Sequence, residues 1–282
     1  MREIPFETIA DAVASACIEA NRRLPDDVVR GLETILAFEK HPTAREVLRA
    51  LLENARIAVK TGLPLCQDTG LVVVFADLGQ DVHLTGGLLE DAVNEGVRRG
   101  YREGLLRSSM LARPLDRASN TGDNTPAVLH VRLVPGDTLR LTVAPKGGGC
   151  ENMSATWMLT PAQGRRGVVH AIVARVKEAG GQPCPPLILG VGLGGSFELA
   201  ALLAKRAAVM GPIGEPNSDP ELADLEAEIL EAVNATGIGP MGLGGATTAL
   251  WVRVEFYPCH IASLPVALNV QCHSARHQTV EL

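Results

Sequence analysis

Three of the six cysteines stand where an apolar run gives way to polar residues. Cys66 ends the apolar stretch 63–65 and precedes Gln-Asp-Thr-Gly, Cys184 lies before two prolines, and Cys272 follows the strand-like LPVALNVQ and precedes a histidine. A single cysteine of this kind is more often a small buried hydrophobe. Three such cysteines at the ends of elements, where functional groups collect, favour a metal or iron–sulfur site built on thiolates.

The other cysteines differ in their surroundings. Cys17 lies on the apolar face of a helical pattern and is predicted to be core, whereas Cys150 and Cys259 stay ambiguous. The sequence has no CxxC pair of the kind found in zinc ribbons. The first residues show no signal peptide, so we expect a cytoplasmic protein, in which disulfides are rare. The cysteines are therefore expected to be buried thiols or ligands drawn together by the fold.

A triple glycine in the string APKGGGCENMS, residues 144–154, is a second candidate. The lysine precedes the glycines and no GK[ST] follows, so the string is not a phosphate loop. It indicates either a tight turn or, as we favour, backbone that admits a ligand. Lys146 is equally consistent with a solvated surface charge and with binding of a carboxylate.

Two glycine patterns resemble a dinucleotide-binding motif. Gly190, Gly192 and Gly195 satisfy GxGxxG after a predicted strand, and residues 237–242 satisfy it again. A glycine-rich chain produces such matches by chance, and no clear second βαβ half follows. Nicotinamide binding is therefore a minor alternative. The helix expected after Gly195 would still present N–H groups to an anion.

Helices and strands are expected to alternate in the first half of the chain. Apolar spacing indicates helices around residues 9–18, 47–59 and 87–107, and the run 71–79 is β-rich. Two alternating runs on either side of Pro135-Gly136-Asp137 predict a hairpin.

The second half predicts a helix over 160–180, a buried strand and glycine turn at 186–196 followed by a helix, a helix over 219–237, and strands from 247 onward. No linker or internal repeat is visible. We therefore expect one domain, residues 1–282, of the mixed α/β class. In it, helices pack on short β-sheets and glycine-rich loops surround the site.

Composition excludes several classes of function. The net charge of -6 disfavours a nucleic acid or a membrane surface as partner, and aromatic residues make up only 3% of the chain. No apolar stretch is long enough to span a membrane. A small-molecule substrate is the expected partner.

The sequence resembles a known family, the iron–sulfur (class I) fumarate hydratases and the related L-tartrate dehydratases. The resemblance covers most of the chain, in order. It is similar to the α subunit of the two-subunit form, because it ends soon after the last string. The strings that carry it are LCQDTG (65–70), NTGDNTPA (120–127), PKGGGCEN (145–152), CPPLILGVGLGGS (184–196), GIGPMGLGGATTAL (237–250) and HIASLPVALNVQCHSARH (260–277).

The resemblance implies a [4Fe–4S] cluster held by Cys66, Cys184 and Cys272, with one iron open to substrate. An open coordination position makes a metal a Lewis acid, whereas clusters with four protein ligands transfer electrons. The sequence departs from the family pattern at Cys150, where serine is the more familiar residue; a thiol here offers a different ligand set as an alternative, but we keep Cys150 as a non-ligand.

The family's substrate contacts fall on residues beside these ligands. Gln67 and Asp68 are the implied catalytic residues; Asp68 would protonate or orient the departing hydroxyl, unless it only caps the turn. Arg107 would pair with a substrate carboxylate. The remaining implied substrate contacts are Lys146, Gly148 and Gly149.

His273 and His277 are either partners of the cluster or a polar end of the chain. The resemblance also implies a β subunit that carries the second catalytic domain, in an α2β2-type assembly. We therefore expect reversible hydration of fumarate to L-malate, a step of the tricarboxylic acid cycle. Dehydration of L-tartrate to oxaloacetate is the alternative within the family, and an iron–sulfur redox protein is the alternative from another class.

Overall fold

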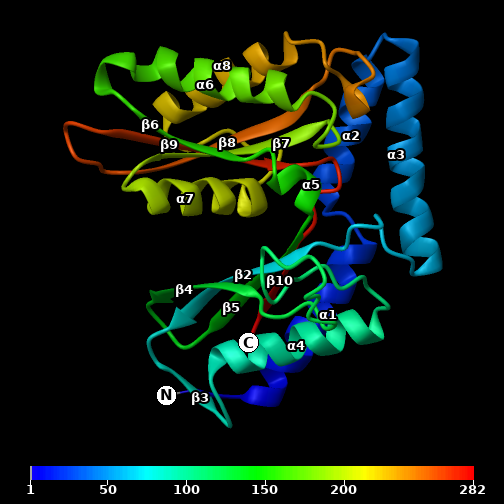
Figure 1. Ribbon diagram of the computed structural model, residues 1–282, viewed down its shortest axis with the longest axis vertical. Coiled ribbons are helices and arrows are strands. Elements are labelled where there is room, and N and C mark those ends of the chain that lie inside the picture. Colours follow the sequence, from blue (N-terminus) through cyan, green and yellow to red (C-terminus); the bar gives the residue numbers. More distant parts are fainter. Residues whose placement is uncertain (1) are drawn as a thin grey trace. The chain divides into compact units, whose positions relative to one another are not determined.

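The computed structural model describes residues 2–282, and the chain divides into two compact units (Figure 1). Each unit is assembled from separate stretches of sequence. The helices α3 (Pro42–Thr61) and α5 (Gly148–Glu151) contain points where the chain passes from one unit to the other. The first unit comprises Met1–Pro25, Ala55–Gly148 and Arg276–Leu282, and the second comprises Asp26–Asn54 and Gly149–Ala275.

The first unit is a four-stranded sheet with two helices on one face (Figure 1). The strand order is β10-β5-β2-β4, in which β2 is antiparallel to β5 and parallel to β4. A separate parallel pair joins β1 to β3. The elements are β1 (Arg2–Pro5), α1 (Phe6–Arg22), β2 (Leu71–Gly79), β3 (Val82–Thr85), α4 (Leu89–Glu103), β4 (Val128–Val134), β5 (Leu139–Lys146) and β10 (Gln278–Glu281).

Close packing of α1 against α4 builds the core of this unit. A Cβ on Gly96 would lie 2.6 Å from the carbonyl oxygen of Ala10, and one on Gly100 would lie 2.8 Å from that of Ala14. The two glycines therefore let the helix backbones approach each other. Apolar residues of both helices meet the buried strands β2 and β5 beneath them.

The second unit is a four-stranded sheet covered on both faces (Figure 1). The strand order is β6-β9-β7-β8; β7 is parallel to β8 and antiparallel to β9. The helices α6 and α8 cover one face and α7 covers the other. The elements are α2 (Asp26–Phe38), β6 (Ala155–Leu159), α6 (Gly164–Ala179), β7 (Leu187–Gly194), α7 (Phe197–Met210), α8 (Pro220–Asn234), β8 (Ala249–Tyr257) and β9 (Leu264–Gln271), with 3₁₀ turns at Pro161–Gln163 and Pro240–Gly242.

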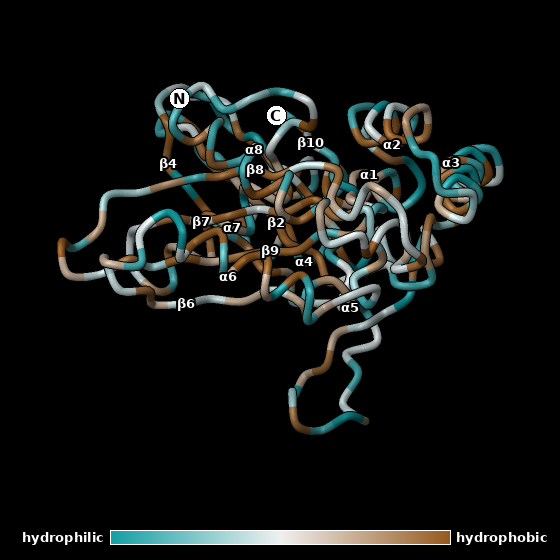
Figure 2. Tube along the Cα trace, turned by 90° about the horizontal axis from the view of Figure 1, so that it is seen from above, coloured by the Kyte–Doolittle hydropathy of each residue, from teal (hydrophilic) through white to brown (hydrophobic). Residues whose placement is uncertain are grey.

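The strands β2, β5, β7 and β9 are the most buried strands of the two sheets. Figure 2 shows β2, β7 and β9 as predominantly hydrophobic segments. β7 is buried along almost its whole length, as expected for a strand that has neighbours on both sides and helices on both faces. No helix within residues 2–282 combines the length and apolar character needed to cross a bilayer.

The mixed α/β class predicted from the sequence is confirmed. That residues 1–282 form one domain stays a prediction. Most of the expected elements are present, including the strand at 71–79 and the helix after Thr160, whose side chain forms a capping box with Gln163. The helix expected over 87–107 is shorter, Leu89–Glu103.

The predicted hairpin at Pro135-Gly136-Asp137 is wrong. Its two strands, β4 and β5, do not pair, because β2 lies between them. β2 is a continuous apolar run that is buried over most of its length, so it takes the centre of the sheet. The turn is instead anchored to the end of β2, where the N–H groups of Gln80 and Asp81 donate to Val134 and Gly136.

Candidate functional site

In the first unit, the loop after α3 places Cys66 beside two polar residues. The Sγ of Cys66 accepts the N–H of Asp68 at 3.4 Å, and it lies 3.4 Å from Oε1 of Gln67. Cys66 and Asp68 are half-buried and Gln67 is exposed. The N–H of Asp68 and the amide oxygen of Gln67 therefore fix the position of the Cys66 sulfur within this loop.

The carboxylate of Asp68 connects two of the sequence strings. Its Oδ1 accepts the N–H of Gly70 at 3.0 Å, and its Oδ2 accepts the N–H of Gly148 at 2.8 Å. The turn-capping alternative for Asp68 is therefore present in the structure. Because Gly148 belongs to the triple glycine, the same carboxylate also holds LCQDTG against PKGGG.

The backbone at the triple glycine is open on its outer side. A Cβ on Gly149 would meet nothing within 4 Å, and one on Gly148 would meet only Oδ2 of Asp68 at 3.8 Å. These two glycines are therefore not required for packing. Their exposure agrees with backbone that admits a ligand.

Lys146 is fully buried at the end of β5, so the alternative of a solvated surface lysine is wrong. The register pairs it with Leu71, and its backbone nitrogen would lie 2.8 Å from a Cβ on Gly70. Gly70 also has a φ of +77°, so only glycine suits this position. A role for Lys146 in substrate binding stays a prediction.

Three buried side chains fix the carbonyl groups of the Cys66 loop. The hydroxyl of Tyr101 donates to the carbonyls of Thr69 at 2.6 Å and Gly70 at 3.0 Å. Nδ2 of Asn124 donates to Gly70 at 3.1 Å, and the guanidinium of Arg276 donates to the carbonyl of Asp68. Burial raises the pKa of Tyr101 well above its usual value, so the hydroxyl stays a donor. The loop is held through its backbone.

Asn124 also positions the segment that carries Arg107. Its Oδ1 accepts the N–H of Ser109 at 2.8 Å, while Thr69 donates its hydroxyl to the carbonyl of Arg107 at 2.9 Å. Asn124 is fully buried and has a φ of +62°, a conformation that asparagine tolerates better than most residues. The guanidinium-bearing Arg107 is exposed, and its backbone is tied to the Cys66 loop.

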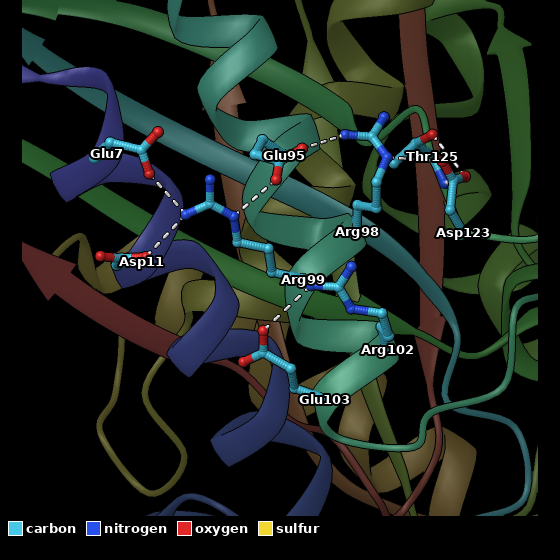
Figure 3. A network of polar contacts seen from close by, with 9 residues as sticks. All are labelled: Glu7, Asp11, Glu95, Arg98, Arg99, Arg102, Glu103, Asp123 and Thr125. Atoms are coloured by element: carbon cyan, nitrogen blue, oxygen red, sulfur yellow. Dashed lines mark hydrogen bonds and ion pairs between the residues drawn. The ribbon is translucent and has the colours of Figure 1, made fainter.

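A charged network on α4 holds the loop that presents Asn124 (Figure 3). Nε of Arg98 donates to Asp123 at 3.1 Å, and the other oxygen of Asp123 accepts the N–H and hydroxyl of Thr125. Burial alone would raise the pKa of Asp123, but the bonds from Thr125 and Arg98 lower it overall. The string NTGDNTPA is therefore fixed to α4 through Asp123, and it holds the Cys66 loop through Asn124.

In the second unit, Cys184 and Cys272 lie at the same end of the sheet. Cys272 follows the last residue of β9, which pairs with Ile188 near the start of β7, and Cys184 precedes β7. The carbonyl of Cys184 accepts the N–H of His273 at 3.2 Å, and Nδ1 of His273 lies 3.0 Å from the same oxygen. His273 therefore connects the two cysteine segments.

Cys184 has an uncommon backbone conformation. Its φ of +56° lies in the left-handed region, where a cysteine is disfavoured by its Cβ. Such strain persists only where the surroundings impose it, and it is concentrated at functional sites. The surrounding structure therefore holds the backbone of half-buried Cys184 in a conformation that cysteine does not prefer.

The second glycine-rich loop supplies that support. The N–H of Met241 donates to the carbonyl of Pro185 at 2.8 Å, and a Cβ on Gly242 would lie 2.6 Å from the Cα of Gly181. The loop is itself anchored by the buried Glu39, whose Oε2 accepts the N–H of Ala246 at 2.8 Å. Burial would raise the pKa of Glu39, but hydrogen bonds from the backbone N–H groups of His41, Ala246 and Lys40 lower it overall.

The GxGxxG pattern at Gly190–Gly195 serves helix packing. A Cβ on Gly190 would lie 2.1 Å from the carbonyl oxygen of Ala204, and one on Gly192 would lie 1.9 Å from that of Ala200. Both glycines therefore face the backbone of α7. This packing accounts for both glycines without a nucleotide.

The other three cysteines are either buried or exposed. Cys17 is fully buried, and burial raises the pKa of its thiol to about 12. Cys150 is 4% exposed within the apolar core of the second unit, and Cys259 is exposed. Cys66, Cys184 and Cys272 are the three of intermediate exposure. This donor set of three accessible soft thiols, each at the end of an element, suits an iron–sulfur cluster.

The predicted site residues are divided between the two units. Cys66, Gln67, Asp68, Arg107, Lys146 and Gly148 belong to the first, and Gly149, Cys184 and Cys272 belong to the second. Among residues 2–282, no group of three or more His, Cys, Asp or Glu side chains gathers as a metal site. Half-buried His277 follows Arg276 in the first unit, and its role stays a prediction.

Sequence reasoning missed the residues that support the loops. Tyr101, Asn124 and Arg276 hold the Cys66 loop, and Glu39 holds the second glycine loop. The only available signal was the density of polar residues within the strings NTGDNTPA and HSARH.

Comparison with known proteins shows the family of this chain. The model of the family described as fumarate hydratase (Fumerase) matches residues 10–281. The chain belongs to the fumarate hydratase family. A member from Methanocaldococcus jannaschii, provisionally named L(+)-tartrate dehydratase subunit alpha, is 39% identical over 273 residues, which is 95% of each chain. The L(+)-tartrate dehydratase subunit alpha of Escherichia coli (strain K12) is 30% identical over 276 residues, which is 96% of this chain and 90% of the relative.

Members of this family are hydro-lyases, and the predicted enzyme class is confirmed. Both fumarate hydratase and tartrate dehydratase names occur among the matches, so the family is established at the level of reaction type.

Proposed function

We propose that this chain is the α subunit of a hydro-lyase that reversibly hydrates fumarate to L-malate. The observation that supports the proposal is the hydrogen bond from the N–H of Gly148 to the carboxylate of Asp68, whose own N–H contacts the sulfur of Cys66 in the same unit. A carboxylate, glycine backbone that a ligand can approach and a thiolate ligand are parts that polar addition of water to a small dicarboxylate can use.

Cys66, Cys184 and Cys272 would hold a [4Fe–4S] cluster, since their donor chemistry and exposure fit it. When bound through three thiolates, such a cluster supplies a Lewis-acidic metal position next to the substrate. The N–H of Asp68 and the carbonyl contacts of His273 keep two of these cysteine segments in fixed orientations.

The protein's own groups would bind and orient the dicarboxylate. Arg107 offers an exposed guanidinium suited to bidentate pairing with a carboxylate. Gly148 and Gly149 offer backbone that a substrate can approach closely. Asp68 would orient the hydroxyl that is gained or lost, with Gln67 exposed beside it, and buried Lys146 would add positive charge at the end of β5.

The active site would be completed by a separate β subunit in an α2β2-type assembly. The relatives are named subunit alpha, which supports a heteromeric partner. The same names favour L-tartrate dehydration to oxaloacetate as the second candidate function. The two hydroxy acids, L-malate and L-tartrate, differ by one hydroxyl, and one residue contacting that hydroxyl would decide between them.

Anaerobic reconstitution with iron and sulfide, together with the β subunit, tests the proposal. We expect kcat/KM for fumarate and L-malate to exceed that for L-tartrate. The reverse order would establish the second candidate. A cluster-loaded complex that turns over none of the three substrates would contradict the hydro-lyase assignment and favour a redox protein.

Replacement of single cysteines tests the ligand set. Serine at Cys66, Cys184 or Cys272 is expected to lower bound iron, measured by metal analysis, because a hydroxyl is a poor soft ligand. Cys17→Ser and Cys259→Ser are the matched controls and are expected to retain iron. Loss of iron in Cys150→Ser alone would show that the ligands are assigned wrongly.

A further inference from the structure

The last strand of the first unit's sheet, β4, leaves apolar side chains exposed. Along β4, Val128 is 41% exposed, Val131 is 51% exposed and Leu133 is 71% exposed. β4 stands at the end of the order β10-β5-β2-β4, with β2 on one side. An edge strand with exposed apolar residues is a template for pairing with another chain.

These exposed residues continue the core of the unit. In the parallel register, Val131 lies beside Ala76 and Leu133 lies beside Leu78, both of which belong to the face covered by α1 and α4. Leu129, nearer the start of β4, is still packed against that core. The helices α1 and α4 therefore stop covering this face of the sheet along β4, and the apolar side chains of β4 that follow are exposed.

β4 has little of the usual protection of edge strands, since Arg132 is its one charged residue. It contains no lysine and no proline, and its register with β2 runs over seven pairs, Val73↔Val128 to Gly79↔Val134, without a shift. The opposite edge strand, β10, is only four residues long and carries Gln278, Thr279 and Glu281. Natural sheets blunt their edges with short strands, charges, prolines or bulges; β10 is short and carries a charge, whereas β4 has only the charge of Arg132.

The order of side chains along β4 indicates that a second copy of β4 is the strand that pairs with this edge. The strand VLHVRLV (128–134) has the same apolar pattern in both directions, with Val131 at its centre. Antiparallel pairing of two copies about a twofold axis at Val131 would place Leu129 opposite Leu133 and Val128 opposite Val134. A twofold interface requires such self-complementarity.

We propose that two copies of this chain associate by antiparallel pairing of their β4 strands, forming one continuous sheet of eight strands. On the helix-covered face, the pairs Leu129–Leu133 and Val131–Val131 would form an apolar ladder. On the other face, Arg132 is already neutralised by bidentate contact with Asp77 at 2.8 and 2.9 Å, so it does not oppose the approach of a second copy. The inference does not depend on the substrate or cluster.

Sedimentation of the full-length chain tests the proposal. The wild type is expected to dimerise over a concentration series up to roughly 100 µM. Val131→Lys and Leu133→Lys are expected to be folded monomers, because the changed side chains are exposed and charge blocks edge pairing. Leu115→Lys, at a residue 99% exposed in another loop, is the matched control and should stay dimeric. A monomeric wild type, or a dimer unaffected by both β4 lysines, would overturn the proposal.

Disulfide trapping tests the register, both on the chain alone and on the complex with its β subunit. Val131→Cys is expected to cross-link to itself, because residues directly opposite lie about 4.5 to 5.5 Å apart between Cα atoms. Leu133→Cys should not, because its symmetry mate lies four positions away, roughly 13 Å. Peptide mass spectrometry distinguishes the link from native cysteines. Absence of the 131–131 link, or its equal formation in Leu133→Cys, would rule out this register.

Discussion

At the scale of single residues, the loop that carries Cys66 and Asp68 is positioned through its carbonyl groups. Tyr101, Asn124 and Arg276 donate to three consecutive carbonyls, those of Asp68, Thr69 and Gly70. Such contacts fix the backbone while leaving the side chains of Cys66 and Gln67 available for a ligand. Loss of the last donor to a buried carbonyl costs more than the bond itself contributes.

Asn124→Ala is expected to lower the free energy of unfolding by about 1 to 3 kcal/mol, because it leaves the N–H of Ser109 without its acceptor and removes one of the two donors, Asn124 and Tyr101, to the carbonyl of Gly70. The measurement is chemical denaturation. Asn120→Ala is the matched control. Asn120 makes similar bonds to Ser108 but is exposed, so water replaces them and we expect a loss below about 1 kcal/mol. Equal losses in both variants would contradict the interpretation.

The Cys17 thiol gives a prediction for alkaline pH. Its pKa is raised by burial from 9.0 to about 12, whereas the unfolded thiol ionises near its usual value. The neutral thiol therefore stabilises the fold fully below pH 9, and this contribution falls as the pH rises toward 12. The stability difference between the wild type and Cys17→Ala should narrow by up to about 1.4 kcal/mol per pH unit above the unfolded pKa. A constant difference in denaturation experiments across this range would contradict burial of Cys17.

Sequence reasoning found the residues with reactive side chains but not those that hold them. Cys66, Asp68 and Arg107 were recognisable because thiol, carboxylate and guanidinium groups sit in strings with a family resemblance. Tyr101 and Arg276 act on carbonyls that any residue could present, 32 and 208 positions away from the residues whose carbonyls they contact. No local pattern encodes such pairs, so only the fold shows them.

At the scale of elements, whether a segment forms a helix or a strand was more predictable than which strands it pairs with. β4 and β5 were recognised as strands, but the expected hairpin failed because β2, far earlier in the chain, lies between them. The short strands β1, β3 and β6 and the helix α2 were not predicted from the sequence. The glycine pattern after β7 has a packing role, with α7 lying directly on the backbone of the strand.

Gly192→Ala is expected to destabilise the second unit by about 3 kcal/mol or more, because the new Cβ would lie 1.9 Å from the carbonyl oxygen of Ala200 and would displace α7. Thermal unfolding measures the effect. Gly149→Ala is the matched control for stability, since its Cβ would meet nothing within 4 Å. If the two variants unfold at the same temperature, α7 does not rest on Gly192 as described.

At the scale of the whole molecule, the two units are interleaved along the chain. The first unit is made of three segments, and its last segment, Arg276–Leu282, is the end of the sequence. This segment supplies β10, which pairs with β5, and the buried Arg276, which donates to Pro145 at 3.3 Å and to Asp68. The sequence suggested no division, because neither unit is bounded by a linker.

Deletion of residues 276–282 is expected to loosen the first unit, although removal of a few terminal residues is usually tolerated. β5 would lose its β10 neighbour and the carbonyl of Asp68 would lose Arg276. Hydrogen exchange should show faster exchange in β5 and the Cys66 loop, with β7 and β9 unchanged. Thr279→Ala, which removes only the contact with Thr142, is the control. Unchanged protection of β5 would show that the end of the chain is dispensable.

The late position of Arg276 also determines when the site is finished during synthesis. Domains usually fold in order as the chain leaves the ribosome, from the N-terminal end. Here the loop that carries Cys66 is translated in the first quarter of the chain, yet one of its carbonyl donors is translated among the last seven residues, Arg276–Leu282. The loop that carries Cys66 therefore reaches its final form only after Arg276 has left the ribosome, so a segment of the first unit that is made early waits for one that is made much later.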